Sequence, residues 1–371
     1  MSGPSEMRTA LLAAGGTGGH MFPAEALARE LLGRGWRLVM ITDQRGAECG
    51  PHMEGVQTHT VSSAKMVGQG LWAKLFGVVF LIRGIWQARR IIRCTKPDII
   101  IGFGGYASVP AVAAGFLAGL PLVVHEQNAV LGRANRLFAR FLKAVATAYD
   151  DVQHLPDSIP VVRVGMPVRD EIRALGRLPY RPPAETDSIS ILVLGGSQGA
   201  RALTDVIPGA LGRLPDDVKT RLRVSHQARP EDVVRAEGMY QKIGIQATVS
   251  SFFADVPQRL EQCHLVIARA GASTVAEVTV SGRPAVFIPY PAAADDHQMA
   301  NARAVEQAGG AVVLPQDILN SETMADVCCR LISNIHTLVT LSSRAVSWSV
   351  PDAARRLGDV VEGIVQKKVL P

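Results

Sequence analysis

Short apolar runs alternate with helical patterns from the start of the chain. Thr9–Ala14 and Leu38–Thr42 have the pattern of strands, and Pro23–Leu32 between them has that of a helix. The same alternation continues through Asp98–Ile101, Pro110–Leu117, Leu122–His125, Leu131–Phe141 and Val161–Val164. Because strands that alternate with helices are typical of a parallel sheet covered by helices, we predict a first α/β domain over residues 1–164.

The pattern stops and then restarts. Residues 165–188 contain four prolines and little periodicity, which predicts a linker. A strand at Ile189–Leu194, a glycine-rich turn at Gly195–Ala200 and a helix at Leu203–Leu211 follow. Further strands are predicted at Leu222–Ser225, Ala247–Val249, Leu265–Ala268, Ala285–Ile288 and Ala311–Val313. We predict a second domain over residues 189–350 and a C-terminal segment, 351–371, whose helix (Asp352–Val365) packs back toward the first domain.

The expected fold class is therefore α/β, with two doubly wound Rossmann-like domains that face each other across a cleft. In such sheets the loops at the carboxyl ends of the strands bind ligands.

One segment, Ile99–Val124, carries no charged side chain over a length sufficient to span a bilayer. Seven glycines and prolines divide it into a strand, a loop, a helix and a second strand. Lipid does not accept such irregular backbone, so we favour a buried α/β core over a transmembrane helix.

Composition narrows the class of protein. Hydrophobic residues make up 47% of the 371 residues and charged residues 19%, which predicts a globular chain. The five cysteines form no C-x-x-C pair, so neither a disulfide framework nor a zinc site is indicated. With no pattern of a secretory signal at its start, the protein is expected in the cytoplasm.

The net charge of +6 is unevenly distributed. Residues 1–168 hold 17 Lys and Arg against 11 Asp and Glu, whereas residues 169–371 hold 22 of each. Between Glu54 and Asp98 there is no acidic residue, and seven cations alternate with Leu, Phe, Ile, Val and Trp. This mixture suits a helix that lies on an anionic membrane surface. The alternative is an ordinary packed helix with a solvated basic edge; nucleic acid is not expected as a partner, since no binding motif accompanies the patch.

Three glycine-rich loops follow apolar strands: Gly15–His20, Gly102–Tyr106 and Gly195–Ala200. Such loops bring backbone N–H groups close to a bound anion. The first lacks the last glycine of a dinucleotide fingerprint, because Met21 occupies that position, and it lacks the Lys of a P-loop. A single glycine-rich loop could serve only to let a helix pack tightly against a strand. Three such loops after predicted strands indicate a binding site instead, and the loop Gly195–Ala200 is expected to bind the diphosphate.

Polar residues follow other strands. Glu277 lies on the helix predicted after Leu265–Ala268, where its carboxylate suits a ribose diol; the alternative is a capping box with Ser273 or Thr274 as N-cap. Asp295–Gln298 suits sugar hydroxyls, and no further acidic partner lies close enough in sequence to indicate a metal.

The run His125–Asn128 also ends a strand. We predict His20 as the proton acceptor, with His125 or Glu126 as alternatives that orient it or replace it; for either histidine, a buried structural role is the competing interpretation.

Taken together, one set of motifs in this order resembles the bacterial UDP-N-acetylglucosamine transferases of peptidoglycan synthesis, the MurG family of glycosyltransferase family 28: GGTGGH, GFGGY, HEQN, GMPVR, GGSQGA, GASTVAE and DDHQ. The resemblance covers nearly the whole chain. It implies the GT-B fold and transfer of GlcNAc from UDP-GlcNAc to the C4 hydroxyl of undecaprenyl-diphospho-MurNAc-pentapeptide (lipid I to lipid II), with inversion.

The resemblance also implies a set of donor-binding residues. Glu277 is expected to hold the ribose, Arg169 and Ser197 to lie near the diphosphate, Phe253 to lie at the uracil end, and Gln298 to contact GlcNAc. The full set is Thr17, Gly18, Gly19, Asn128, Arg169, Ser197, Phe253, Ala272, Ser273, Thr274, Val275, Ala276, Glu277 and Gln298. Met166 stands where close relatives are expected to have Asn.

The implied chemistry is one direct displacement with His20 as base and Glu126 as second choice. No metal site and no tightly bound cofactor are expected, with a divalent cation at most stimulatory. The expected partners are UDP-GlcNAc, lipid I, an anionic membrane surface and other cell-wall synthesis proteins, at the cytoplasmic face of the inner membrane as a peripheral protein. The competing functions are a UDP-sugar 2-epimerase and a non-catalytic nucleotide-sugar-binding membrane module.

Overall fold

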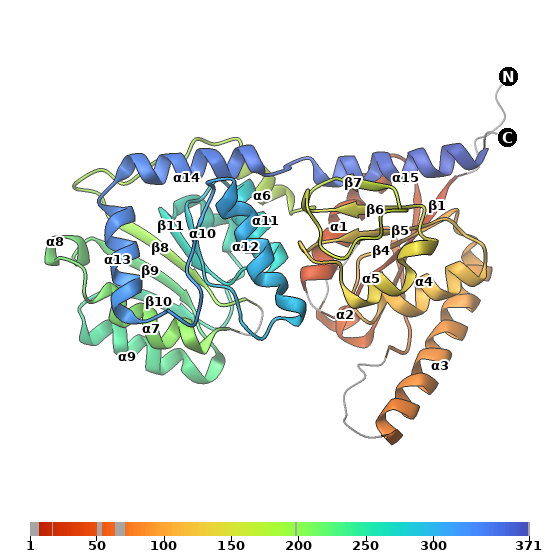
Figure 1. The fold of residues 1–371 in the computed structure, drawn as a ribbon, viewed down its shortest axis with the longest axis horizontal. Helices are drawn as coiled ribbons and strands as arrows, with labels where there is room; N and C mark the ends of the chain where they lie inside the picture. Colours follow the sequence, from red (N-terminus) through yellow and green to blue (C-terminus); the bar gives the residue numbers. More distant parts are fainter. Residues whose placement is uncertain (1–6, 17, 50–53, 64–70, 197–198, 370–371) are drawn as a thin grey trace. The chain divides into compact units, whose positions relative to one another are not determined.

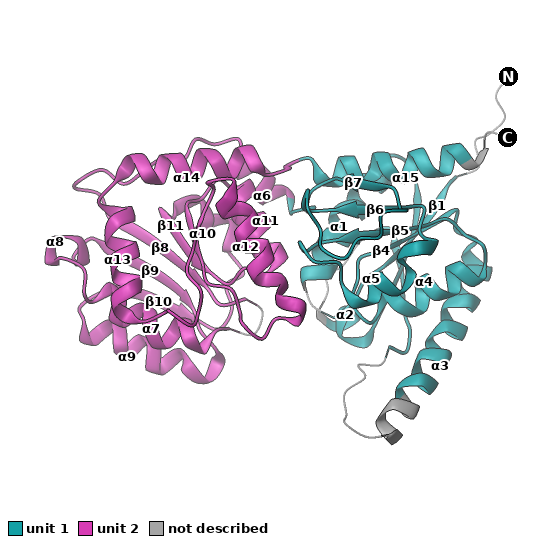
Figure 2. Cartoon of the chain, in the orientation of Figure 1, with its two compact units in different colours: residues 1–169, 352–371 teal, residues 170–351 magenta. Residues whose placement is uncertain are grey.

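The structure is a computed structural model that describes residues 7–16, 18–49, 54–63, 71–196 and 199–369 (Figure 1). It divides into two compact units (Figure 2). Unit 1 comprises residues 1–169 and 352–371, and unit 2 comprises residues 170–351.

Among its described residues, unit 1 contains a seven-stranded parallel sheet in the order β3-β2-β1-β4-β5-β6-β7. The strands are β1 (Thr9–Ala13), β2 (Arg37–Thr42), β3 (Val56–Thr60), β4 (Ile99–Gly102), β5 (Leu122–Glu126), β6 (Ala144–Thr147) and β7 (Val161–Arg163). The helices are α1 (Gly18–Gly33), α2 (Gln44–Cys49), α3 (Leu71–Thr95), α4 (Ser108–Leu117), α5 (Arg133–Phe138), the 3₁₀ turn η1 (Ala139–Phe141) and α15 (Ala353–Val369).

The central strands β1, β4 and β5 of unit 1 are buried at every position because both faces of the sheet are covered. Alternate residues such as Leu12 and Ile101 join a core with α1 and with Leu357 and Val361 of α15. Helix α4 packs against β4 and β5, and α3 packs on α4. Strands buried on both faces have continuous apolar sequences, which is why β4 and β5 carry no charge before Glu126.

The charge-free segment has the predicted structure: strand β4, a glycine-rich turn, helix α4 and strand β5. The buried interpretation is confirmed for this segment, since β4 and β5 are buried throughout.

No helix in the part of the chain that the structure describes is long and apolar enough to cross a membrane.

Unit 2 repeats the arrangement. Its described residues form a six-stranded parallel sheet in the order β10-β9-β8-β11-β12-β13. The strands are β8 (Ile189–Leu194), β9 (Leu222–Gln227), β10 (Gln246–Ser250), β11 (Leu265–Ala268), β12 (Ala285–Phe287) and β13 (Val312–Val313). The helices are α6 (Asp170–Leu175), α7 (Arg201–Leu211), α8 (Asp216–Lys219), α9 (Val233–Lys242), α10 (Val256–Gln262), α11 (Ala272–Val280), α12 (His297–Gln307), α13 (Ser321–Ile332) and α14 (Ile335–Trp348), with 3₁₀ turns η2 (Pro230–Asp232) and η3 (Ala294–Asp296).

Three details differ from the sequence-based expectations. Helix α1 begins at Gly18, five residues before the predicted start at Pro23, so this proline lies inside the helix. Residues 165–188 are not a featureless linker, because α6 forms there and packs against α10 and α11 of unit 2. The division between the units falls after Arg169 rather than after Val164.

A buried polar chain joins three elements of unit 2. His226 of β9 is completely buried, with Nδ1 2.8 Å from the Tyr240 hydroxyl of α9 and Nε2 3.4 Å from Thr204 Oγ1 of α7. Burial lowers the pKa of His226 to about 4. The imidazole is therefore neutral in the folded protein at neutral pH.

We predict that His226 makes the protein acid-sensitive. Its folded pKa lies below the ordinary value of 6.5, so its contribution to stability is complete above pH 6.5 and is lost as the pH falls toward 4. Between pH 7.5 and 5 this loss amounts to about 2 kcal/mol. The variant His226→Gln lacks this titration. Thermal unfolding followed by circular dichroism at both pH values should show a smaller acid-induced drop than in the native chain, whereas His336→Gln, at an exposed histidine of α14, should behave like the native chain.

Candidate active site

Each sheet reverses its strand order beside its first strand, and the glycine-rich loops, with His20, lie at these two points. In unit 1 the reversal lies between β1 and β4, and in unit 2 between β8 and β11. Ligands of open α/β sheets bind where the loops diverge at the carboxyl ends of such strands. In unit 1 the loops are Gly15–His20 and Gly102–Tyr106, and in unit 2 they are Gly195–Ala200 and the segment from Arg269 to Gly271.

His20 lies in the first turn of α1, and its ring is held by the loop after β4. Its Nδ1 lies 2.8 Å from the Phe103 carbonyl oxygen. Because a carbonyl only accepts hydrogen bonds, Nδ1 must carry the hydrogen, and the Nε2 atom of the neutral ring has the lone pair that accepts a proton. Gln127 Nε2 donates to the same carbonyl at 3.0 Å. This arrangement fixes the tautomer required of a general base.

The glycines of the GFGGY loop are required by this close packing. Gly104 and Gly105 have φ values of +80° and +74°, which side chains rarely adopt. A Cβ on Gly105 would lie 3.3 Å from the Gly15 carbonyl oxygen and 3.4 Å from Cδ2 of His20. The backbone of the second glycine loop therefore lies directly against the catalytic candidate and the first glycine loop.

Asp43, just after β2, fixes the first glycine loop from the other side. Its Oδ1 accepts from the backbone nitrogens of Gly16, at 3.0 Å, and Gly46, at 2.8 Å. The carboxylate thus ties Gly16 of the first loop to the start of α2.

Glu126 is buried and organises the loop that follows β5. Its Oε1 accepts from the backbone nitrogen of Asn128 at 3.1 Å and from Asn128 Nδ2 at 3.3 Å. Its Oε2 accepts from the Gly132 nitrogen and from Asn135 Nδ2, both at 2.8 Å. Since both oxygens are engaged by N–H groups, this geometry favours a positioning role for Glu126 over that of a base.

His125 is completely buried and ties β5 to the segment that follows β7. Its Nε2 donates to the Gly165 carbonyl oxygen at 2.8 Å, and its ring lies 5.9 Å from that of Phe103. Burial lowers the pKa of His125 to about 4, and the nearby His20 contributes in the same direction. A buried, neutral histidine is a structural element, so His20 remains the better base.

At the reversal in unit 2, the glycine loop after β8 leads into α7. Gly199 has a φ of +66°, and a Cβ there would lie 2.8 Å from the backbone nitrogen of Arg229. The loop therefore lies close to the segment after β9. Helix α7 begins at Arg201, directly behind the loop, so its N-terminal amides and the positive end of its dipole point toward this end of the sheet.

The N-terminus of α11 differs from the capping box that was the alternative role for Glu277. Its N-cap is Gly271, whose backbone is extended, and no side chain caps it. Ser273 and Thr274 lie inside the first turn, so the capping-box interpretation of Glu277 is wrong. Glu277 lies farther along α11 and is half-buried.

The loop after β12 is anchored by a buried arginine. Arg269 Nη1 donates to the carbonyl oxygens of Ile288 and Pro289, both at 3.1 Å, and Nη2 donates to Gln316 Oε1 at 2.6 Å. Burial lowers the pKa of Arg269. The loop then passes through Asp295 and Asp296, both with φ near +50°, a conformation that costs energy and is concentrated at functional sites.

Gln298 follows this strained turn. Its Oε1 accepts from the Tyr290 nitrogen at 3.0 Å, which orients the amide so that Nε2 is its donor end.

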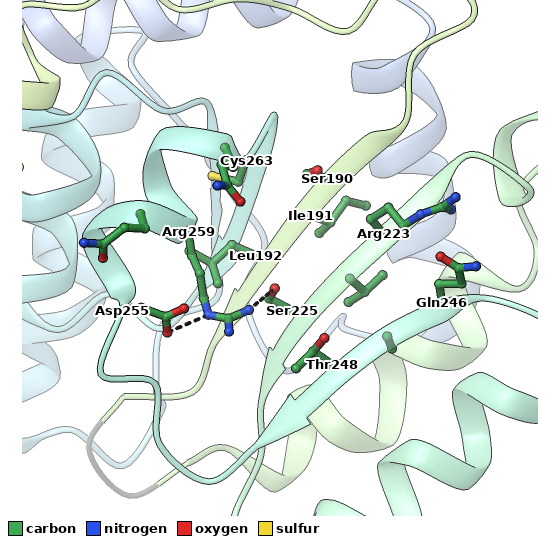
Figure 3. Close-up of a pocket in the computed structure, with 14 residues that line it drawn as sticks. Ser190, Ile191, Leu192, Arg223, Ser225, Gln246, Thr248, Asp255, Arg259 and Cys263 are labelled. Carbon is green, nitrogen blue, oxygen red and sulfur yellow. Dashed lines mark hydrogen bonds and ion pairs between the residues drawn. The ribbon is translucent and has the colours of Figure 1, made fainter.

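A cavity of about 350 Å³ in unit 2 lies elsewhere (Figure 3). It is lined by polar residues of β8, β9 and β10, among them Ser190, Arg223 and Gln246 near the amino ends of these strands, and by α10. The predicted donor residues follow the carboxyl ends, so this cavity is not the predicted donor site.

Comparison with known proteins identifies the family. The model of the glycosyltransferase family 28 N-terminal domain matches residues 10–147, and that of the C-terminal domain matches residues 190–357. A UDP-N-acetylglucosamine--N-acetylmuramyl-(pentapeptide) pyrophosphoryl-undecaprenol N-acetylglucosamine transferase of Paramagnetospirillum magneticum is 50% identical, over 95% of this chain and 96% of its own. The protein of the same name from Rhodospirillum centenum is 48% identical, over 96% and 94%. The chain belongs to glycosyltransferase family 28.

A solved structure supports the same family assignment. The crystal structure of Acinetobacter baumannii MurG matches with a TM-score of 0.75 and 28% identity, over 96% of this chain and 99% of that one. The predicted resemblance and the GT-B class of two α/β domains are confirmed, and the chain is a glycosyltransferase.

The structure places the residues that the family resemblance implies on both units. Unit 1 holds Gly18, Gly19 and Asn128 at the ends of β1 and β5, together with Arg169, whose guanidinium lies 5.2 Å from the Phe22 ring centroid. Unit 2 holds Phe253, the run from Ala272 to Glu277, and Gln298. Thr17 and Ser197 lie outside the described residues. Met166 is buried.

Sequence reasoning missed three residues that lie at the candidate loops. Asp43 and Arg269 act on backbone atoms far away in the sequence, and no local motif signals this. Phe252 is an aromatic ring that is 73% exposed at the carboxyl end of β10, next to Phe253. A cluster of adjacent aromatic residues directly after a predicted strand was the available signal.

Within the described residues, no group of three or more His, Cys, Asp or Glu side chains is placed to hold a metal ion.

We predict that Glu126→Gln destabilises unit 1. The change replaces one acceptor oxygen with a donor that faces other N–H groups, and leaves at least one buried group unsatisfied, at a cost of about 2 kcal/mol. The melting temperature should fall by about 4–8 °C, and Glu54→Gln, at an exposed position, should leave it unchanged. A large loss of kcat at an unchanged melting temperature would instead make Glu126 the base.

Proposed function

We propose that this protein transfers GlcNAc from UDP-GlcNAc to the muramoyl C4 hydroxyl of lipid I, the undecaprenyl-diphosphate-linked MurNAc-pentapeptide, and so produces lipid II. The observation that carries the proposal is the 48–50% identity to curated transferases of this name over nearly the whole chain. The geometry at the two strand-order reversals supplies residues suited to both halves of the reaction.

Unit 2 binds the donor. Glu277 accepts hydrogen bonds from the ribose hydroxyls, as acidic residues do in many nucleotide sites. Gln298 donates from Nε2 to GlcNAc hydroxyls, because its Oε1 is held by the Tyr290 nitrogen. The uracil lies against the segment at Phe253, where the exposed Phe252 ring offers a stacking surface.

The chemical step is a single displacement at the anomeric carbon. His20 Nε2 takes the proton of the acceptor hydroxyl, its oxygen forms a bond to the anomeric carbon, and the bond from that carbon to the UDP oxygen breaks on the opposite face. One displacement inverts the configuration. The negative charge that develops on UDP is stabilised by the amides of the glycine loop after β8 and by the N-terminus of α7. The family resemblance implies the same role for the Arg169 guanidinium.

Helix α3 supports attachment to an anionic membrane surface. Its inner face, which includes Gly84, Ala88 and Ile92, is buried against the domain. Its outer face exposes Ile82 at 61% and Trp86 at 65%, together with Val78, Val79 and Phe80. An ordinary packed helix presents polar residues to water, so an outward apolar stripe favours the membrane interpretation.

Cations border this apolar stripe. Trp86, Arg89, Arg90 and Arg93 line a surface cavity of about 340 Å³ on α3. Other elements of unit 1 also expose apolar side chains: the ring centroids of Phe116 and Phe141 lie 4.4 Å apart, each ring is nearly half exposed, and Leu117 and Leu137 are more exposed still. Such a surface holds the protein at the cytoplasmic face of the inner membrane, where a lipid-linked acceptor lies.

The transfer reaction is tested by release of UDP from UDP-GlcNAc with and without a soluble lipid I analogue. The native chain should release UDP only with the acceptor and form a GlcNAc-bearing product. His20→Ala should lower kcat by about 10²–10⁴-fold, the usual contribution of a general base, with UDP binding retained.

Two outcomes would contradict the proposal. Epimerisation of UDP-GlcNAc without acceptor would indicate a 2-epimerase, and donor binding without turnover would indicate a binding module. If the kcat of the His20→Ala variant equals that of the native chain, a group other than His20 is the base.

Membrane attachment is tested with anionic vesicles. Replacing Arg89, Arg90 and Arg93 with Gln removes three cations, each worth about 1 kcal/mol near acidic lipid, so the partition coefficient should fall by about 100-fold. Turnover of the soluble acceptor should be unchanged. The matched control replaces Arg344, Arg355 and Arg356, which carry the same charge on α14 and α15. Equal sedimentation of the two triple variants would refute a specific role for α3.

A further inference from the structure

Arg259, on α10, joins three separate parts of unit 2 through one guanidinium group. Its Nε donates to Asp255 Oδ1 at 2.9 Å, and its Nη1 donates to Ser225 Oγ of β9 at 2.7 Å (Figure 3). Its Cζ atom lies over the Phe253 ring, 4.0 Å from the ring centroid. One side chain thus contacts a strand, a loop carboxylate and a loop aromatic ring.

Two of these partners belong to residues 251–255, a segment with neither helix nor strand, directly after β10. The start of the segment is held by two other hydrogen bonds: Gln227 Nε2, at the end of β9, donates to the Ser251 carbonyl oxygen at 3.3 Å, and Ser250 Oγ donates to the Phe252 carbonyl oxygen at 2.7 Å. Arg259 holds its second half, where Phe253 is buried and Phe252 projects outward.

The contacts of Arg259 are largely shielded from water, which strengthens them. The Arg259 side chain is only 22% exposed, and Phe253 is 6% exposed, so their stacking is largely shielded from water. The hydrogen bond from Arg259 lowers the pKa of the Asp255 carboxyl, which keeps the loop carboxylate charged and paired. The 350 Å³ cavity borders Arg259, so a truncated side chain leaves the ring and the loop without support on that side.

We propose that Arg259 is a positioning residue for the nucleoside end of the donor site: it holds Phe253 and the 251–255 segment in the binding conformation before UDP arrives. The inference rests on the proposed function, which places the uracil at this segment. Binding then costs less because the loop is already ordered.

The decisive variant is Arg259→Lys. Lysine keeps the charge and can pair with Asp255, but it lacks the planar face that stacks on Phe253 and cannot bond Asp255 and Ser225 in the same forked geometry. We expect the Kd for UDP, measured by titration calorimetry, to rise about five- to tenfold. The KM for UDP-GlcNAc should rise by the same factor with kcat unchanged, since the interaction serves binding in both ground and transition states. Ser225→Ala removes one of the three contacts and should show a smaller rise.

Arg355→Lys is the matched control, because Arg355 pairs with Asp352 and Asp359 on α15 and stacks on no ring in the described contacts. Its Kd for UDP should equal that of the native chain. An unchanged Kd in Arg259→Lys together with a lower melting temperature would overturn the inference and leave Arg259 a purely structural residue. A native chain that binds UDP but transfers nothing would refute the proposed function, while the Kd comparison would still decide the role of Arg259.

Discussion

Parallel strands end at one edge of a sheet, and where the strand order reverses, the two following loops turn to opposite sides and leave their backbone amides uncovered. The reversal beside β1 brings His20 against the loop of Gly104 and Gly105. The reversal beside β8 lies between the strands that lead into α7 and α11. The proposed anion recognition and proton transfer both depend on loops at these two reversals.

Around these points, buried polar groups are paired with backbone atoms and thereby set the shape of the site. The Phe103 carbonyl oxygen accepts a hydrogen bond from His20 and so fixes the tautomer of its ring. The Glu126 carboxylate accepts hydrogen bonds from N–H groups of the loop after β5, and Arg269 donates to carbonyl oxygens after β12. Each pairing is required, because an unsatisfied polar group away from water is costly. The same requirement that stabilises the fold therefore orders the groups that bind and react, which is the preorganisation that catalysis needs.

Apolar residues serve two different purposes in unit 1. In β4 and β5 they fill a core between covered faces, whereas on α3 the residues around Ile82 and Trp86 face outward beside arginines. The core residues stabilise the unit, and the outward ones lower the stability of an isolated, solvated helix. A surface that is unfavourable in water becomes favourable against lipid, and this outward apolar face is the observation on which the proposed membrane attachment rests.

By itself the sequence determined the two α/β units, the division of Ile99–Val124 into buried strands and a helix, the glycine loops and the family, because strand and helix periods and short motifs are local properties of the chain. It did not determine the start of α1 at Gly18, the N-cap at Gly271 or the helix at Asp170–Leu175. Nor did it show that Glu126 is engaged on both oxygens, or that Arg259 stacks on Phe253. Those features depend on packing, since His20 meets a carbonyl 83 residues away and Arg259 meets a hydroxyl 34 residues away. Only the folded sheets bring these groups together, and no pattern along the chain encodes their distances.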